Sequence, residues 1–547
     1  MRQRSLLSFL VIGIVVLLLV GVTACNKSSL SVLNSAGTTR EPSAAMFVLK
    51  QAPVMVSMLV NPDRLTKQEG DGYLSKIKTS LLANTGIDYQ KDIQPWLGNE
   101  ITLAVTSLDV DREPENGKEP GYLMVLTTRQ PEKSREFVNL LFSKRVLAGA
   151  NLSVEQYKGV KLTDDNNHLA GAVVGDRFVL FANKLKVLRE AINNVQAPDL
   201  SLTSSDQYHQ AIKQLPSSPV AMAFLNLPRV AQWQGLELKD KTYDSQVLSV
   251  VLNPKGFLTE TTFVAKEETL PPAQQLSKPV EALQYIPASA GLVISGSDLS
   301  NLGKDNLSQL WNQAKAVVSG SQEDTATKLL RPLSDIQQRW GIDWKEDVFN
   351  WVKGEYAIGL LPRQNQKNPD WVFVVEKSDA TSTGISRWDK IAASHGLLLN
   401  SFTLGDQEIS AWTKLTTDTT KSAATKDEQA FTIQAKVYGT HTSQGNYEII
   451  ANSIEAMNQV LNIKENSLTS NANFQASTAA IPQPNQGYVY IDWTKSQETL
   501  ENHLPILKLA KVVGKPFFDN LRSLTISSYG NQTQLLKGGV FFQLNDP

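Results

Sequence analysis

The sequence has one cysteine, almost no net charge and none of the short motifs that mark common enzyme classes. Cys25 is alone among 547 residues, which excludes internal disulfides and thiolate metal cages. The 53 basic and 54 acidic residues leave a formal charge of −1, so nothing attracts phosphate over long distances and a nucleic-acid partner is not expected. Neither GxSxG nor GxxxxGK[ST] occurs, so two common nucleophile and nucleotide signatures are missing.

Histidines are also few, and their spacing is not that of a metal site. No pair lies at an i, i+4 or HExxH spacing. The five are His168, His209, His395, His441 and His503. The acidic stretch 109–120 offers a calcium loop as an alternative, but an EF-hand needs glycine and glutamate where Pro114 and Pro120 stand. We expect a charged hairpin tip there, and no metal or cofactor.

One stretch of the chain occurs twice. Residues 85–108 read TGIDYQKDIQPWLGNEITLAVTSL, and residues 340–362 read WGIDWKEDVFNWVKGEYAIGLLP. In an ungapped alignment, six of 19 consecutive pairs are identical, where chance would give roughly one. These pairs are Gly86/Gly341, Ile87/Ile342, Asp88/Asp343, Asp92/Asp347, Trp96/Trp351 and Glu100/Glu355. The sequence therefore predicts two tandem copies of one module.

The repeated acidic residues allow two interpretations. They are Asp88, Asp92 and Glu100 in the first copy and Asp343, Asp347 and Glu355 in the second. Acid/base catalysis would need one carboxyl group in an apolar pocket that shifts its pKa, and nothing in the sequence indicates one. Helix caps and turn ligands are the simpler interpretation, and no catalytic residue is predicted. For Trp96 and Trp351 we favour anchoring in the core over stacking on a ligand.

The N-terminus predicts attachment to a membrane. After Arg2 and Arg4, the uncharged run Leu6 to Ala24 would rise about 28 Å as a helix, close to the thickness of bilayer hydrocarbon. The preceding positive charges place the rest of the chain on the far side of the membrane. Two anchoring modes stay open: an uncleaved spanning helix, or a lipobox-like Val22-Thr23-Ala24-Cys25 whose Cys25 is lipidated.

Composition and connections set the expected domains. Residues 1–25 are the anchor or lipoprotein-type signal, 26–45 a polar flexible tether, 46–265 module one, 266–280 a linker containing proline, and 281–547 module two. Most strand connections are too short for parallel crossovers. Each module should therefore be α+β, a mainly antiparallel sheet with helices on one face. The modules could pack about a pseudo-twofold axis or end to end.

The chain also resembles a known family. The stretches APVMVSMLVNPDRL and QPWLGNEITLAVTSLDVDREPENGKEPGYLMVL, together with the N-terminal anchor, are similar to the cyanobacterial family of membrane-tethered proteins with domain of unknown function 3352 (DUF3352). The resemblance spans nearly the whole chain. It implies a bacterial envelope or thylakoid-facing setting and supplies no reaction and no site residues.

Three functions remain as hypotheses. The first is a non-catalytic, membrane-tethered scaffold or assembly factor on the periplasmic or lumenal side, which binds an unidentified protein partner through its broad sheets. The second is a carrier or chaperone that holds an apolar ligand, a lipid or a pigment, between sheet and helices. The third is a hydrolase whose site the sequence does not reveal.

Overall fold

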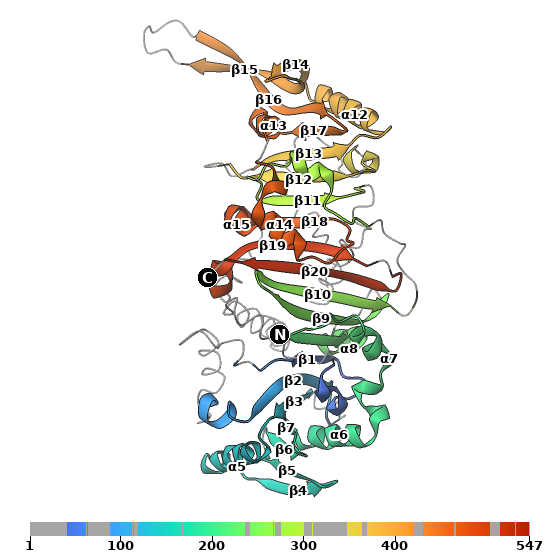
Figure 1. The fold of residues 1–547 in the computed structure, drawn as a ribbon, viewed down its shortest axis with the longest axis vertical. Coiled ribbons are helices and arrows are strands. Elements are labelled where there is room, and N and C mark those ends of the chain that lie inside the picture. Colours follow the sequence, from blue (N-terminus) through green and yellow to red (C-terminus); the bar gives the residue numbers. More distant parts are fainter. Residues whose placement is uncertain are drawn as a thin grey trace.

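A single antiparallel sheet runs through the whole described molecule (Figure 1). The computed structural model describes residues 41–61, 63, 88–111, 113, 119–166, 169–235, 241–265, 267, 275–299, 309, 347–363, 369–420, 430–463, 466–503, 515–530 and 532–545. Within these ranges, twenty strands form one sheet, and every pairing between them is antiparallel. The expected α+β class with a mainly antiparallel sheet is confirmed.

The strands vary in length from five residues, as in β4, to fifteen in β16. The first ten are β1 (Val54–Met58), β2 (Leu97–Ser107), β3 (Gly121–Thr128), β4 (Ser153–Tyr157), β5 (Val160–Asp164), β6 (Ala170–Val174), β7 (Phe178–Ala182), β8 (Ala221–Asn226), β9 (Tyr243–Asn253) and β10 (Gly256–Ala265). The second ten are β11 (Leu292–Gly296), β12 (Tyr356–Leu361), β13 (Asp370–Glu376), β14 (Leu398–Leu404), β15 (Gln407–Thr420), β16 (Ala430–Gln444), β17 (Tyr447–Ala451), β18 (Tyr488–Asp492), β19 (Leu521–Tyr529) and β20 (Leu535–Leu544).

The two sets of ten strands are paired in the same way. Nine strand pairings occur within the set β1 to β10, and each of them recurs within the set β11 to β20 with both strand numbers raised by ten. For example, β1 lies between β2 and β8, and β11 lies between β12 and β18. Across the sheet the order is 4-5-6-7-3-2-1-8-9-10, then 20-19-18-11-12-13-17-16-15-14. We call β1 to β10 the first half and β11 to β20 the second half.

The halves meet at β10 and β20, the last strand of each. These strands pair antiparallel over nine residue pairs, from Gly256 opposite Gln543 to Val264 opposite Leu535. Neither separate sheets nor a linker-spaced arrangement is present, because this ladder makes the two halves one continuous sheet. Figure 1 shows the result as an elongated molecule with β4 at one end and β14 at the other.

Helices cover both faces of the sheet, so the expectation of helices on one face is wrong. The α-helices with described bounds are α5 (Pro131–Leu147), α6 (Leu185–Gln196), α7 (Asp206–Ile212), α8 (Leu227–Gln234), α12 (Thr381–Ser394), α13 (Ile454–Leu461), α14 (Ala472–Ala479), α15 (Trp493–His503) and α17 (Lys515–Asn520). Short helical turns are η1 (Ser43–Phe47), η2 (Tyr89–Ile93), η4 (Pro198–Leu200), η5 (Leu202–Ser204), η6 (Glu281–Tyr285), η8 (Phe349–Trp351) and η9 (Leu468–Ser470).

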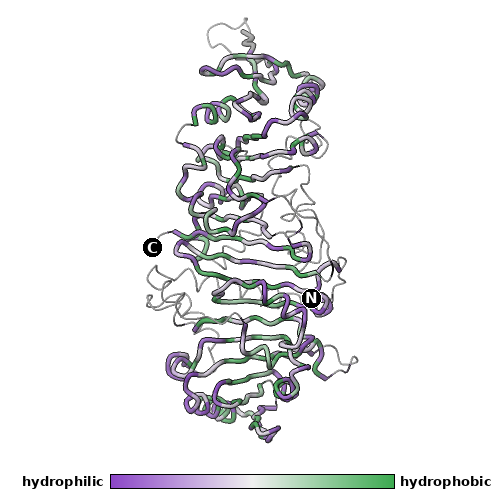
Figure 2. The backbone as a smooth tube through the Cα atoms, turned by 45° about the vertical axis from the view of Figure 1, so that its right-hand side comes forward, coloured by the Kyte–Doolittle hydropathy of each residue, from purple (hydrophilic) through white to green (hydrophobic). Residues whose placement is uncertain are grey.

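Neighbouring residues of one strand show why both faces need cover. On β7, Val179 clusters with Phe137 of α5, whereas the next residue, Leu180, clusters with Leu188 of α6. Adjacent strand residues point to opposite faces, so α5 and α6 lie on opposite sides. Strands such as β12, buried at all six positions, are unbroken apolar runs, which is typical of a sheet covered twice. Figure 2 shows hydrophobic stretches following the strands, with hydrophilic residues at the turns and on the helices.

Both connecting segments end earlier than the sequence predicts. The expected tether reached residue 45, but η1 begins at Ser43, and Ala44 and Ala45 are fully buried. The expected linker reached residue 280, but Leu276 exchanges two backbone hydrogen bonds with Asn485, and Val280 is buried. The polar composition of the two segments gave no sign of these contacts, because backbone groups, which are the same in every residue, make most of them.

The expected membrane anchor lies outside the described residues. Leu6 to Ala24 and Cys25 belong to residues 1–40, which are not among the described residues. Among the residues that are described, none of the helices has both the length and the apolar character needed to span a bilayer.

Candidate functional site

In the first half, the repeated residues organise the turn that leads into β2. Asp88 precedes η2 and accepts a hydrogen bond from the Lys91 backbone N–H, while Asp92 accepts one from the Asp88 N–H at 2.8 Å. The Trp96 indole donates to the Asp92 carbonyl at 2.7 Å and is buried, with 1% of its surface exposed. Trp96 lies in the turn that follows η2. These contacts close a turn and leave no free acid.

The second half uses the same contact. The Trp351 indole donates to the Asp347 carbonyl at 2.9 Å, and Trp388 of α12 donates to the same oxygen at 2.9 Å. The Asp347 carboxylate pairs with Arg387 at 2.6 Å. Asp343 lies outside the described residues. Both repeated tryptophans therefore join the core through an indole hydrogen bond to the residue four positions earlier.

Glu100 and Glu355 each bind the first turn of a short helix that precedes their neighbouring strand. Glu100 accepts hydrogen bonds from the backbone N–H groups of Ser43 and Ala44 at 2.9 and 2.8 Å and from the Ser43 hydroxyl at 2.5 Å. Glu355 accepts from the N–H groups of Glu281 and Ala282 at 2.6 and 3.4 Å. A carboxylate at a helix N-terminus satisfies N–H groups that have no partner within the helix. Both glutamates are thus helix caps that act across the sheet.

Hydroxyl groups complete the two glutamate sites differently. In the first half the Thr102 hydroxyl donates to Glu100 at 3.1 Å. In the second half the Tyr447 hydroxyl donates to Glu355 at 3.1 Å, and burial, followed by the nearby Glu355 carboxylate, raises the pKa of Tyr447. The carboxylates of Asp88, Asp92 and Glu100 serve separate backbone partners and do not converge on one pocket. The arrangement fits a structural role better than acid/base chemistry.

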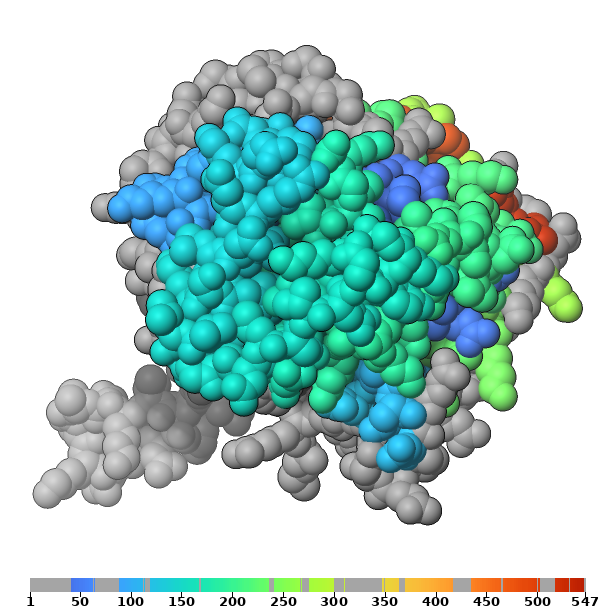
Figure 3. Space-filling view, turned by 90° about the horizontal axis from the view of Figure 1, so that it is seen from below, coloured from blue at the N-terminus to red at the C-terminus, as the bar shows by residue number. Residues whose placement is uncertain are grey.

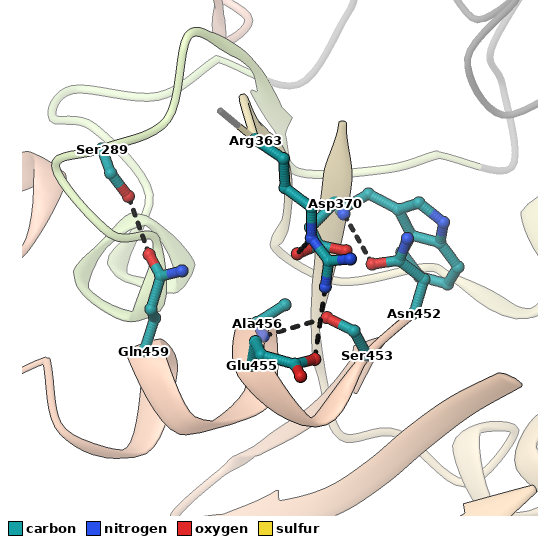
Figure 4. A network of polar contacts seen from close by, with 9 residues as sticks. Ser289, Arg363, Asp370, Asn452, Ser453, Glu455, Ala456 and Gln459 are labelled. Carbon is teal, nitrogen blue, oxygen red and sulfur yellow. Dashed lines mark hydrogen bonds and ion pairs between the residues drawn. The ribbon is translucent and has the colours of Figure 1, made fainter. Parts of the chain in front are cut away.

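Sequence reasoning missed one repeated residue. Asn183 directly follows β7 and accepts the Tyr122 backbone N–H at 2.8 Å, and Asn452 directly follows β17 and accepts the Trp371 N–H at 2.8 Å (Figure 4). Asn183 precedes Lys184, the N-cap residue of α6, whose side chain makes no capping hydrogen bond. The signal was present in the sequence, since FVLFAN and YEIIAN end the two strands alike.

His441 of β16 has two close acidic neighbours. Its Nδ1 lies 3.2 Å from Glu448 Oε1, and its Nε2 lies 3.5 Å from Asp389 Oδ1. Asp389 already accepts the Trp412 indole N–H at 2.8 Å, and Glu448 accepts the Ser443 hydroxyl at 2.5 Å. Across the described ranges, no group of three or more histidine, cysteine or acidic side chains is arranged to hold a metal ion. The cluster joins α12 to the end of the sheet.

A half-open apolar groove lies on the first half of the sheet. Its volume is about 300 Å³, and its floor is made by β1, β2, β3 and β7. The residues that share this face are Val54, Val56, Leu103, Val105, Tyr122, Met124 and Phe181. Tyr122 and Met124 remain 38% and 36% exposed. Partial burial of Tyr122 raises the pKa of its phenol.

The equivalent face of the second half is closed. Tyr122 pairs with Val105 and Met124 with Leu103, and at the equivalent places Trp371 pairs with Leu360 and Phe373 with Ile358. Trp371 and Phe373 are only 6% and 3% exposed and belong to the large core cluster that includes Trp388 of α12. The repeated residues recur because the fold needs them twice, whereas the groove is open in one half.

The sequence over residues 10–544 matches the family model described as "Protein of unknown function (DUF3352)". The chain belongs to this family. The match covers nearly all of both halves, so DUF3352 membership applies to the whole twenty-stranded sheet and not to one part of it.

Comparison with other proteins adds little to the family assignment. No curated protein matches the chain. Among solved structures, the DUF3352 chain is similar to crystal form I of TP0453, with 9% identity and a TM-score of 0.25, over 42% of this chain and 81% of that chain. Crystal form IV gives 11% identity and a TM-score of 0.25, over 40% and 79%.

Proposed function

We propose that this protein is a non-catalytic scaffold, tethered to a membrane and exposed on its periplasmic or lumenal side, that binds another protein by adding a strand to its sheet. The observation that supports this most is the end strand β14. It has seven residues, Leu398 to Leu404, without a charge, and it pairs on one side only, with β15, among the described strands. Such an edge presents backbone N–H and C=O groups to a second chain.

The opposite end of the sheet gives a contrast within the same chain. Strand β4 occupies the position in the first half that β14 occupies in the second, and it has five residues. Glu155 in the middle of β4 pairs with Arg189 of α6, whereas Leu398 and Leu399 of β14 are 54% and 51% exposed. Seen from below, residues of the first half cover this end of the molecule (Figure 3). Charge and short length protect β4 from pairing, and β14 has neither protection.

A tandem duplication accounts for the sheet that carries this edge. The recurring pairings, the glutamate caps and the two asparagines support descent of both halves from one module. Equivalent strands β10 and β20 pair antiparallel, which is the arrangement of a local twofold axis. A duplicated, continuous sheet gives a long rigid body suited to holding a partner away from a membrane.

Membrane attachment through residues 1–25 is the second part of the proposal. Leu6 to Ala24 is long and apolar enough to span a bilayer, and Cys25 offers lipidation as the alternative. Resistance of the full chain to alkaline carbonate extraction is the expected result. The mass of the mature N-terminus then separates the two modes, because a lipid-modified Cys25 excludes the spanning helix. Release of the intact chain by carbonate would reject both.

Affinity capture of the full chain from membranes in mild detergent tests the scaffold. A stoichiometric partner should copurify with the wild type and be lost from Ser401→Lys, which places a charge in the middle of β14. Val154→Lys makes the same change on the exposed face of β4 and should keep the partner. A chain that elutes alone, or a partner that both variants retain, would contradict strand addition at β14.

A further inference from the structure

The open groove of the first half has a chemistry of its own. Its floor is almost entirely hydrocarbon, and the side-chain amide of Asn183 beside it already has partners. Asn183 accepts the Tyr122 backbone N–H and donates its amide hydrogen to the Pro120 carbonyl at 2.9 Å. Tyr122 lines the groove, and 38% of its residue surface is accessible. An occupant therefore finds apolar surface along the groove and one partly exposed tyrosine.

The apolar lining excludes a peptide strand as occupant of the groove. A peptide carries one N–H and one C=O per residue, and burying them without partners costs more than the apolar contact returns. The backbone groups of β1, β2, β3 and β7 are engaged in their own ladders, and a groove on the face of a sheet offers no free edge. A plain hydrocarbon chain has no such cost.

The volume of the groove fits a single hydrocarbon chain. A volume of about 300 Å³ is at the lower end of the range for small-molecule pockets, which is about 300 to 1,000 Å³. A ring system such as a pigment needs a wider, flatter space than a trough between the side chains of neighbouring strands. Met124 supports a flexible occupant, because its unbranched thioether adapts to a chain of variable shape.

The second half shows that the fold does not require the opening. Trp371 and Phe373 fill the places of Tyr122 and Met124 and are almost completely buried. The strands, their register and the following asparagine are otherwise equivalent. The smaller residues of the first half thus keep apolar surface exposed where larger ones would close it, and such exposure has a cost in water.

The open half is also the half next to the N-terminal segment. Ser43 and Ala44 are held by Glu100 on β2, the strand that also forms part of the groove floor. Fifteen residues, 26–40, connect Cys25 with Glu41, and such a chain spans at most about 50 Å. If residues 1–25 are in a bilayer, this half is within reach of its lipids.

We propose that the groove of the first half holds one acyl chain of a membrane phospholipid, with the lipid headgroup left at the margin near Tyr122. This goes beyond the scaffold function and rests only on the proposed membrane attachment. The occupant is taken from the membrane to which the chain is tethered. The face of the second half holds none.

Photo-crosslinking in proteoliposomes tests the proposal. The full chain is reconstituted with a small fraction of phosphatidylcholine that carries a diazirine on one acyl chain, irradiated and digested with trypsin. Tryptic peptide 119–129 contains Tyr122 and Met124, and peptide 368–377 contains Trp371 and Phe373. Label on 119–129 at least fivefold above that on 368–377 is expected. Equal label on both, or label confined to residues 1–25, would overturn the proposal.

Two variants test whether the label depends on the groove. Tyr122→Trp combined with Met124→Phe gives the first half the residues that the second half already accommodates, and it should reduce label on 119–129 to the level of 368–377. Met124→Lys should do the same by placing a charge in the groove. Unchanged unfolding midpoints show that the variants fold. Undiminished label in both folded variants would overturn the assignment to the groove.

The same experiment with a diazirine fatty acid added to detergent-solubilised chain separates the source of the acyl group from the groove itself. Labelling of peptide 119–129 by the phospholipid supports a membrane source of the acyl chain, whether or not the fatty acid also labels this peptide. Labelling of the peptide by the fatty acid alone overturns the membrane source. Loss of membrane attachment in the carbonate test leaves the fatty acid arm informative, so failure of the groove and failure of the anchor are distinguishable.

Discussion

The phenol of Tyr529 donates a hydrogen bond of 2.6 Å to Glu260 Oε1 and so connects the two halves of the sheet. Tyr529 ends β19 and Glu260 lies on β10, with β20 between them. The phenol spans the intervening strand at Gly539, which pairs with Glu260 and where a Cβ atom would lie 2.9 Å from the Tyr529 hydroxyl. Glycine at this position leaves the space that the hydrogen bond requires.

Removing the phenol should destabilise the junction. Tyr529→Phe leaves the buried Glu260 carboxylate without its donor, and we expect a loss of about 1.5 to 3 kcal/mol in the free energy of unfolding. Burial, followed by the charge of Glu260, raises the pKa of Tyr529, so the phenol remains a donor at every working pH. Urea unfolding followed by tryptophan fluorescence measures the loss. Tyr122→Phe, at a tyrosine whose residue surface is 38% exposed, is the control and should change stability by less than about 0.5 kcal/mol.

The two repeated glutamates should act locally, each on its own helix. Glu100→Gln weakens the bonds to Ser43 and Ala44, and we expect faster hydrogen exchange in η1 and a loss of about 2 kcal/mol, because hydrogen bonds to a charged acceptor are the stronger ones. Glu355→Gln should do the same for η6, with a smaller loss because Glu355 is less buried.

Exchange mass spectrometry on both variants provides the crossed control. Glu100→Gln should leave the exchange of η6 unchanged, and Glu355→Gln should leave that of η1 unchanged. Faster exchange of both helices in either variant would mean that the glutamates support the whole sheet and not one helix each.

Close packing around Trp351 gives a steric prediction. A Cβ atom at Gly384 of α12 would lie 2.4 Å from the Trp351 ring, so Gly384→Ala forces the indole away from its hydrogen bond to Asp347. Overpacking of this kind costs about 1 to 3 kcal/mol, despite the better helix propensity of alanine. Thr383→Ala, at the exposed neighbouring position, should be neutral or slightly stabilising. Equal unfolding midpoints for the two variants would show that the ring moves freely.

Local structure was largely predictable, because local residues determine it. The short strands β4 to β7 and the hairpin of β9 with β10 lie where turn residues such as Lys158-Gly159 and Pro254-Lys255-Gly256 divide apolar runs. The joining of β10 to β20 was not predictable. It depends on contacts between residues almost 300 positions apart, and an apolar strand looks the same whether its neighbour belongs to its own half or to the other.

The candidate sites show the same limit. The repeat identified Glu100 as important and suggested a cap, but its partners Ser43 and Ala44 lie in a segment that looked like a polar tether. The groove was invisible, because Tyr122 and Trp371 are both large aromatic residues on apolar strands. Only their exposures, 38% against 6%, separate a surface that is open to a ligand from one that belongs to the core.

The acid sensitivity of the second half should depend on Glu448. Burial raises its pKa, but hydrogen bonds from His441 and Ser443 outweigh this effect and bring the pKa of Glu448 below its ordinary value. A carboxyl group whose pKa is lower in the folded state stabilises the fold above its unfolded pKa, about 4.3, and loses this contribution as the pH falls through the folded value. Stability should therefore fall below about pH 4.5.

Thermal unfolding between pH 7 and pH 3 measures this contribution. Glu448→Gln should start less stable at pH 7 and show a flatter decline, because the titrating group is gone. Ser443→Ala keeps the carboxylate but removes one donor, which brings the folded pKa of Glu448 closer to its unfolded value, so its decline should be smaller than in the wild type and end at a higher pH. Glu408→Gln, at an exposed glutamate on β15, should follow the wild-type curve. If Glu448→Gln and the wild type decline in parallel, other carboxylates control the acid limb and the His441 cluster is passive.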